Sequence, residues 1–330
     1  MNPKHKPFIF LIGVRKAGTT SLFEMLARHP QIGTNLFSKE PQILCLPQEH
    51  LDRQFDLLER DYPSDTSHVL DGSTFYLYSK NALNAIKTGF PNSKILIILR
   101  DPAKRAYSAY WHLKKKSQGV EKRTFEACID PLLPSNAKGI HFQERQALQA
   151  AKEKGLIAPD KMDYTALEQK YGVDWRQIFT DPFFQYHYIG ESCYHHYLQS
   201  WHDHFDESQL KIVLLEELQK DTSRVLFEVF NFLGLAPYDQ VEASAANPTM
   251  AAQSSLSRLA IRIYQTGVVR QLLRIFGSHK SRIIGRLKSG LYSKAPEMSL
   301  DVYTKTRTLL QAEYDYWQQH LPQTKELWKQ

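Results

Sequence analysis

Cysteines and long hydrophobic runs are both scarce in this sequence. Its 330 residues include three cysteines, Cys45, Cys128 and Cys193, which are too few and too far apart for a disulfide-rich secreted scaffold. The longest uninterrupted apolar runs, 8–12 and 95–99, are much shorter than the roughly 20 residues that a transmembrane helix needs. The first run is also too short for the hydrophobic core of a signal peptide. We therefore expect a soluble, cytoplasmic protein in a reducing compartment.

Acidic residues are missing from one long segment near the C-terminus. Residues 243–296 contain no Asp or Glu but nine lysines and arginines, so their net charge is +9. Because the net charge of the whole chain is only +7, the remaining residues have a net charge of −2. Such a basic block often faces phosphate, sulfate, nucleic acid or an anionic membrane, although a solvated helical face has the same composition. Two roles stay open for residues 254–294. They could border the anion site or the acceptor, or they could make a peripheral contact with the inner face of a membrane.

The apolar residues that are present alternate between strand and helix patterns. Apolar runs at 8–12, 95–99 and 212–215 are typical of strands that are buried on both faces, and each precedes a helical pattern. We expect the second and third strands to span 94–99 and 211–215, each beginning with a lysine. Alternating buried strands and helices predict an α/β fold with a central, mainly parallel sheet flanked by helices.

The remaining segments are interpreted as additions to this α/β core. The core comprises residues 1–118 and 189–240, within one domain that spans the whole chain. The polar, irregular stretch 119–188 is interpreted as a helical insertion on the substrate side. Residues 241–330 are interpreted as a basic helical region that closes the site.

A glycine-bounded loop at 13–21, with the sequence GVRKAGTTS, follows the first expected strand. A strand, a tight loop and a helix N-terminus form an anion site because free backbone N–H groups and the helix dipole converge there. The glycine spacing matches the nucleotide-binding pattern GxxxxGK[ST], but Thr19 replaces its lysine and the loop's own lysine is Lys16. Thr19 and Thr20 can donate hydroxyl hydrogen bonds to phosphate without a metal, which disfavours a kinase or ATPase.

A second polar cluster follows the strand at 94–99. Arg100 leaves the end of this strand, where ligands bind in open α/β sheets. Asp101 and Pro102 predict a helix start, with Asp as the N-cap and Pro at the first helical position. Arg100 can grip an anion with its planar guanidinium, and Ser108 in the helix can add a hydroxyl. A structural Arg–Asp ion pair is the alternative.

Together, the two segments resemble the nucleotide-binding signatures of sulfotransferases that use 3′-phosphoadenosine 5′-phosphosulfate (PAPS). The first resembles the 5′-phosphosulfate loop and the second the 3′-phosphate motif, in the same order. The resemblance is strongest to the carbohydrate branch, the heparan sulfate sulfotransferase-like domains and their soluble bacterial relatives, and it implies a P-loop-like three-layer fold. Three further patches agree: Lys39-Glu40-Pro41, the stretch 192–201, and Glu216-Glu217-Leu218 with 232–235.

This resemblance implies a reaction and a set of residues. A sulfuryl group would pass from PAPS to an acceptor hydroxyl and release 3′,5′-adenosine bisphosphate (PAP), with no metal required. Lys16 would stabilise the leaving PAP, and Glu40 would be the general base. The resemblance assigns cofactor binding to Arg15, Lys16, Ala17, Gly18, Thr19, Thr20, Ser21, Arg100, Ser108, Tyr194, Lys288 and Gly290.

The acceptor is less constrained than the donor. Asp71, Ser73 and His195 are the expected substrate contacts, while Gly72 stands where glycosaminoglycan enzymes usually have a lysine. We expect a glycan hydroxyl, as in an exopolysaccharide precursor, and no nucleic acid. Sulfation of a lipid or secondary-metabolite hydroxyl, a P-loop kinase, and a non-catalytic anion- or membrane-binding module remain alternatives. The histidines between 195 and 204 match no standard zinc spacing.

Overall fold

A computed structural model describes most of the chain. The described residues are 7–36, 38–47, 51–62, 66–116, 121–133, 140–157, 181, 183–238, 250–252 and 292–329. Lys288 and Gly290, both expected to bind the cofactor, lie outside these ranges, as does most of the basic segment 254–294. No helix in the described part of the chain is long and apolar enough to span a membrane.

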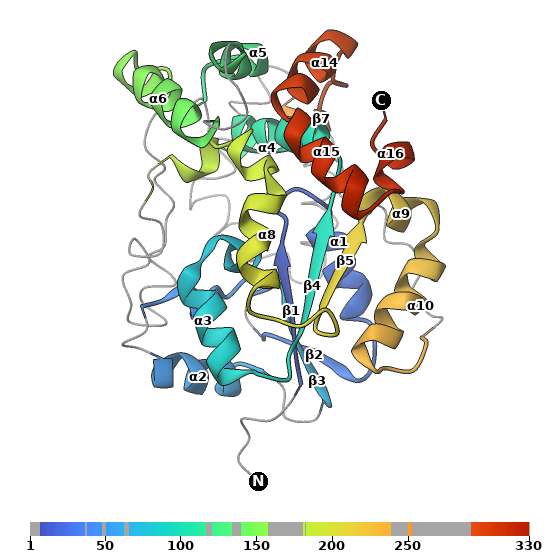
Figure 1. The fold of residues 1–330 in the computed structure, drawn as a ribbon. Coiled ribbons are helices and arrows are strands. Elements are labelled where there is room, and N and C mark those ends of the chain that lie inside the picture. The colour runs from blue at the N-terminus through green and yellow to red at the C-terminus, as the bar shows by residue number, and fades with distance from the viewer. Residues whose placement is uncertain are drawn as a thin grey trace, which may run out of the picture.

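Five parallel strands form the central sheet (Figure 1). Their order across the sheet is β2-β3-β1-β4-β5, so β1 pairs with β3 on one side and β4 on the other, and each neighbouring pair is parallel. This confirms the predicted α/β fold, and the last strand begins one residue earlier than expected. The strands are β1 (Phe8–Gly13), β2 (Ile32–Thr34), β3 (His68–Asp71), β4 (Lys94–Leu99) and β5 (Leu210–Leu214).

Helices cover both faces of the sheet, as Figure 1 shows. On one face, the ring of His29, just after α1, lies 5.0 Å from the ring of Phe230 in α10. On the other, Trp201 Nε1 in α8 donates a 3.2 Å hydrogen bond to the carbonyl of Leu77. The first face carries α1 (Thr19–Leu26), α9 (Leu215–Lys220) and α10 (Thr222–Leu233), and the second η3 (Thr74–Tyr78), α3 (Lys80–Gly89) and α8 (Tyr194–His202).

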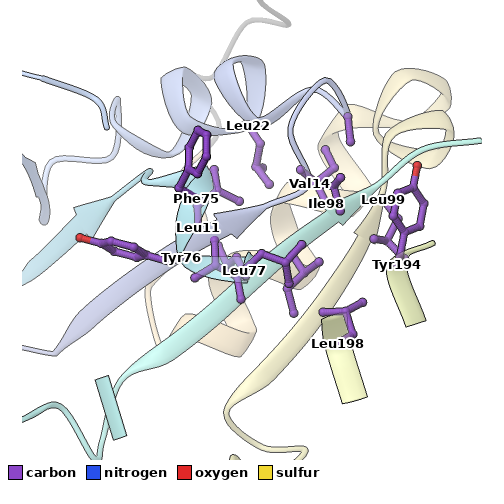
Figure 2. Close-up of a cluster of buried hydrophobic side chains, with 14 of the residues drawn as sticks. Leu11, Val14, Leu22, Phe75, Tyr76, Leu77, Ile98, Leu99, Tyr194 and Leu198 are labelled. Atoms are coloured by element: carbon purple, nitrogen blue, oxygen red, sulfur yellow. The ribbon is translucent and has the colours of Figure 1, made fainter. Parts of the chain in front are cut away.

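The core lies between the central strands and these helices. Figure 2 shows Leu11 of β1 and Ile98 of β4 among side chains that include Leu22, Leu77 and Leu198, all of them buried. Fully burying one such side chain contributes about 1.5–3 kcal/mol. This packing fixes the ends of β1 and β4, from which the two predicted anion-binding segments emerge.

The segment after β4 forms the predicted helix α4 (Pro102–Lys116). Asp101 Oδ1 accepts a 2.9 Å hydrogen bond from the backbone N–H of Lys104, which confirms Asp101 as the N-cap. Beyond α4, the described parts of the insertion form α5 (Phe125–Ile129), η4 (Asp130–Leu132) and α6 (Ile140–Glu153). In Figure 1 they lie at the end of the molecule toward which the strands point.

The remaining elements connect and close this core. Helix α2 (Leu51–Arg60) and the turns η1 (Ile43–Cys45), η7 (Phe184–Tyr186) and η8 (Gly190–Ser192) belong to connections. Strands β6 (Met250–Ala252) and β7 (Tyr292–Lys294) pair antiparallel, and β6 packs against α4. The chain continues through α14 (Leu300–Leu309), α15 (Gln311–His320) and α16 (Thr324–Leu327). All three cysteines are free.

Candidate active site

The loop between β1 and α1 has the backbone shape of an anion cradle. Gly18, the N-cap of α1, has φ 95°, and a Cβ there would lie 2.6 Å from Leu215 Cδ1. Lys16 is also left-handed, with φ 72°. Because Gly18 has no side chain to cap the helix, the first N–H groups of α1 face the loop without a side-chain cap at that position. The positive end of the helix dipole therefore points at the loop.

Arg100 joins the second segment to this loop. Its Nη1 donates a 3.3 Å hydrogen bond to the backbone carbonyl of Lys16. Tyr194, another predicted site residue, donates from its hydroxyl to the Arg100 carbonyl at 3.0 Å. Burial lowers the pKa of the Arg100 guanidinium, so an anion placed beside it would be favoured. The structure thus brings together two segments that are more than 80 residues apart in the sequence.

Lys16 lies against α4, beside a residue that the sequence reasoning missed. Its Nζ is 3.3 Å from His112 Nδ1. Ser108, predicted to contact the 3′-phosphate, is buried on the same helix, four residues before His112. Residues four apart share a helix face, so this spacing was a signal that could have singled out His112.

Glu40, the candidate base, has two polar side-chain partners. Its Oε1 accepts from Lys39 Nζ at 2.8 Å, and its Oε2 accepts from the Thr74 hydroxyl at 3.0 Å. Lys39 Nζ also lies 3.3 Å from Oγ1 of Thr19, the first residue of α1. The Glu40 side chain is 33% exposed, so a substrate can reach this carboxylate beside the anion cradle.

The side chain of Arg15 is held by a buried carboxylate. Its Nη2 donates to Glu191 Oε2 at 2.8 Å, and its guanidinium lies over the ring of Phe184. The fully buried Arg105 donates to the same oxygen at 2.8 Å. The guanidinium of Arg15 therefore braces the loop against residues 184–191. Its side chain is 16% exposed, and its contact with the cofactor stays a prediction.

Asp71 and Ser73 were expected to contact substrate, but both are fully buried. Asp71 Oδ1 accepts from the Ser73 N–H at 2.9 Å, and its Oδ2 accepts from the Tyr76 hydroxyl at 3.0 Å. Ser73 Oγ in turn accepts from the Gln42 N–H at 2.9 Å. Burial raises the pKa of Asp71 to about 6, while hydrogen bonds to Ser73 oppose the shift. In this structure the pair braces the end of β3, and its contact with substrate stays a prediction.

The side chain of His195 contacts helix α15. Its Nδ1 bonds to Glu313 in α15, and its ring stacks on Tyr316 at 5.1 Å. The hydrogen bond to Glu313 raises the pKa of His195. His195 therefore joins α8 to α15. Its side chain is 40% exposed, and its contact with substrate stays a prediction. Within the described ranges, no group of three or more His, Cys, Asp or Glu side chains is arranged to hold a metal ion.

Comparison with known proteins agrees with this geometry. A family model described as "Sulfotransferase domain" matches residues 6–256, which include the cradle, Glu40, Arg100 and Tyr194. The chain belongs to the sulfotransferase domain family. The expectation of a sulfotransferase is thereby confirmed at the level of the family.

The sulfotransferase relatives are distant and mostly much longer. The chain is 27% identical to mouse bifunctional heparan sulfate N-deacetylase/N-sulfotransferase 4, over 74% of this chain and 24% of that protein. It is 23% identical to the membrane-associated sulfotransferase kil1 of Dictyostelium discoideum, over 73% and 59%. A solved sulfotransferase from Alicyclobacillus acidocaldarius is 20% identical and covers 81% of this chain and 94% of its own, with a TM-score of 0.49. The chain thus spans only about a quarter of the heparan sulfate enzyme.

Proposed function

We propose that the chain transfers a sulfuryl group from PAPS to a carbohydrate acceptor. The observation that carries the proposal is the hydrogen bond from Arg100 to the Lys16 carbonyl, because it joins the two anion-binding segments into one site. Family membership supports sulfuryl transfer, and the resemblance of these segments to PAPS signatures supports the donor.

The residues present suit the two anionic ends of PAPS. The loop at 13–21 combines a helix N-terminus, the left-handed Gly18 and the Lys16 ammonium, and it would hold the 5′-phosphosulfate. Arg100 and Ser108 would hold the 3′-phosphate, a group that ATP lacks. PAPS supplies the activated sulfuryl group. The chain supplies positioning and charge stabilisation, as in phosphoryl transfer.

In the proposed reaction, Glu40 would accept a proton and Lys16 would stabilise negative charge. Glu40 takes the proton from the acceptor as the new bond to sulfur forms, and general-base help of this kind is worth about 10²–10⁴-fold. At the opposite end of the breaking S–O bond, Lys16 stabilises the negative charge that builds up on the leaving phosphate. His112 keeps the Lys16 ammonium directed along α4.

For the acceptor, we propose a sugar hydroxyl or amine. The relatives named heparan sulfate N-sulfotransferases favour a glycan acceptor. Because their name denotes transfer to nitrogen, we include an amine beside the expected hydroxyl. Sulfation of a lipid or secondary-metabolite hydroxyl is the second candidate for the same site. The basic segment would then contribute an acceptor rim or a membrane contact.

Transfer of labelled sulfate from PAPS tests the proposal. The acceptors are unsulfated hexuronate–glucosamine oligosaccharides with free or acetylated amines, other unsulfated polysaccharides, and a long-chain alcohol in detergent. We expect label on a glycan, turnover at least 100-fold lower in Glu40→Gln, and PAP affinity in that variant within about twofold of wild type. No transfer to any acceptor, or full turnover in Glu40→Gln, would contradict the proposal or remove Glu40 as the base.

A further inference from the structure

Lys39 contacts both the candidate base and the start of α1. Its Nζ lies 2.8 Å from Glu40 Oε1 and 3.3 Å from Thr19 Oγ1, so it bridges the candidate base and the first residue of α1. Its side chain is 20% exposed. Lys16 lies toward α4, beside His112, so the two ammonium groups have different protein partners.

Gly72 makes room for this lysine. A Cβ on Gly72 would lie 3.2 Å from Lys39 Cε and 2.7 Å from Phe23 Cδ2. The backbone also ties the two positions together, because the Gly72 N–H donates to the Lys39 carbonyl at 3.1 Å. The aliphatic part of the Lys39 side chain therefore passes close to Gly72, and any larger residue at position 72 would narrow the space available to it. The ring of Phe23 lies beneath, with Nζ 5.8 Å from its centroid.

We propose that Lys39 is a second catalytic cation, which binds the sulfuryl oxygens of the donor and holds Glu40 toward the acceptor. The proposal rests on the proposed function. As the S–O bond to the leaving phosphate breaks, a new S–O bond to the acceptor forms, and the acceptor proton passes to Glu40. Lys39 keeps its own proton throughout. It stabilises negative charge on the non-bridging sulfuryl oxygens, whereas Lys16 stabilises the leaving phosphate.

A simple ion pair with Glu40 is the competing interpretation. Partly exposed pairs typically contribute about 0–1 kcal/mol, so this interpretation predicts little effect of removing Lys39 on donor binding. The two interpretations differ most for ligands with and without the sulfuryl group. If Lys39 binds the sulfuryl group, its removal weakens the binding of PAPS but not of PAP. If Lys39 only pairs with Glu40, its removal affects both ligands equally.

Calorimetric binding of PAPS and of PAP to the full chain separates them without any acceptor. In Lys39→Met, which keeps the apolar stem, we expect the PAPS dissociation constant to rise at least fivefold while the PAP constant stays within twofold. Lys39→Arg should restore part of the difference. The matched control is Lys211→Met. Lys211 lies in β5 and its Nζ is 3.7 Å from a carboxylate oxygen of Glu228 in α10. That control should bind both ligands as wild type does.

Turnover gives a second readout. With an unsulfated hexuronate–glucosamine oligosaccharide, Lys39→Met should lower kcat at least 100-fold, and Gly72→Ala should lower it less by displacing the lysine. An unchanged ratio of PAPS to PAP affinity in Lys39→Met would overturn the proposal, as would wild-type kcat. If the proposed function itself is wrong, the result is different: the wild-type chain then binds neither PAPS nor PAP.

Discussion

Tyr314 in α15 donates a 2.9 Å hydrogen bond to Oδ1 of Asp101, the residue directly after Arg100. Tyr303 in α14 donates to the other carboxylate oxygen at 2.8 Å, and Asp101 is fully buried. Burial beside Asp101 raises the pKa of Tyr314, so its hydroxyl stays protonated and donates. Both tyrosines lie beyond the part of the chain that the family model matches. The C-terminal helices therefore hold the strand end that carries Arg100.

Tyr314→Phe should weaken PAP binding although Tyr314 lies on a different element from the proposed phosphate contacts. Losing one hydrogen bond to a buried carboxylate costs about 1.5–3 kcal/mol, part of which should appear as an up to tenfold rise in the PAP dissociation constant. Tyr316→Phe is the matched control, because Tyr316 lies on the same helix and stacks on His195 and His320. Calorimetry measures both variants. Equal PAP affinity in Tyr314→Phe, Tyr316→Phe and wild type would exclude this positioning role.

Arg100 should determine the preference for a 3′-phosphate. We expect wild type to bind PAP more tightly than 5′-AMP, and Arg100→Ala to lose about 1.5–3 kcal/mol of PAP binding, or roughly 10- to 150-fold, with little change for 5′-AMP. Arg224→Ala serves as the control, because Arg224 is an exposed arginine paired with Glu228 in α10. If Arg100→Ala weakened both ligands equally, Arg100 would support the loop rather than the 3′-phosphate.

Lys16 should affect turnover more than binding. Its ammonium is expected to stabilise charge that develops on the leaving phosphate, so Lys16→Ala should lower kcat about 10²–10³-fold and PAP affinity by less. His112→Ala should lower kcat by a smaller factor, because the lysine loses its neighbour but keeps its charge. Lys94→Ala, at the other end of β4, should behave as wild type. Steady-state kinetics with labelled PAPS measure all three, and wild-type kcat in Lys16→Ala would refute this assignment.

His187 should give the fold a pH-dependent contribution. Its two ring nitrogens lie 3.2 Å from Glu144 Oε2 and 3.0 Å from Asp181 Oδ2. Burial lowers the pKa of His187, but the hydrogen bonds to Asp181 and Glu144 outweigh it and raise that pKa to about 10. Because the folded-state pKa is above the unfolded value of 6.5, the added stability is complete below about pH 6.5 and disappears as the pH rises through about 10.

Urea unfolding of His187→Gln tests this pH dependence. At pH 6 the variant should be less stable than wild type by about 1.5–3 kcal/mol, and the difference should shrink toward pH 10. His204→Gln, which removes an exposed histidine bonded to the Ser200 carbonyl, is the control. A difference that stays constant from pH 6 to pH 10 would show that His187 is not charged in the folded protein.

Much of the fold and part of the site followed from local sequence patterns. The runs at 8–12 and 95–99 predicted β1 and β4 because strands buried on both faces need continuous apolar residues. Asp101-Pro102 predicted the start of α4 from capping chemistry alone. The glycine spacing predicted an anion loop, and Arg100 was expected at the same sheet edge because parallel strands place their carboxyl ends together.

Side-chain partners distant in the sequence could not be predicted in this way. Nothing near Arg15 indicates that Glu191 holds its guanidinium, 176 residues away. Asp71 was expected to contact substrate, and nothing near it in the sequence indicates that the Tyr76 hydroxyl donates to its carboxylate. Lys39 was noted only as part of the Lys39-Glu40-Pro41 patch, because its approach to Thr19 depends on how the connection after β2 lies across Gly72. These contacts depend on tertiary packing.

Thermal unfolding with PAP, compared with ATP and Mg²⁺, tests the central claim most directly. A ligand that binds only the folded chain stabilises it by about 2.7 kcal/mol at 100 times its dissociation constant. At equal concentrations, we expect PAP to raise Tm by more than ATP with Mg²⁺, and this preference to disappear in Arg100→Ala. Greater stabilisation by ATP with Mg²⁺, or none by PAP, would contradict the assignment of this site to a PAPS-dependent sulfotransferase.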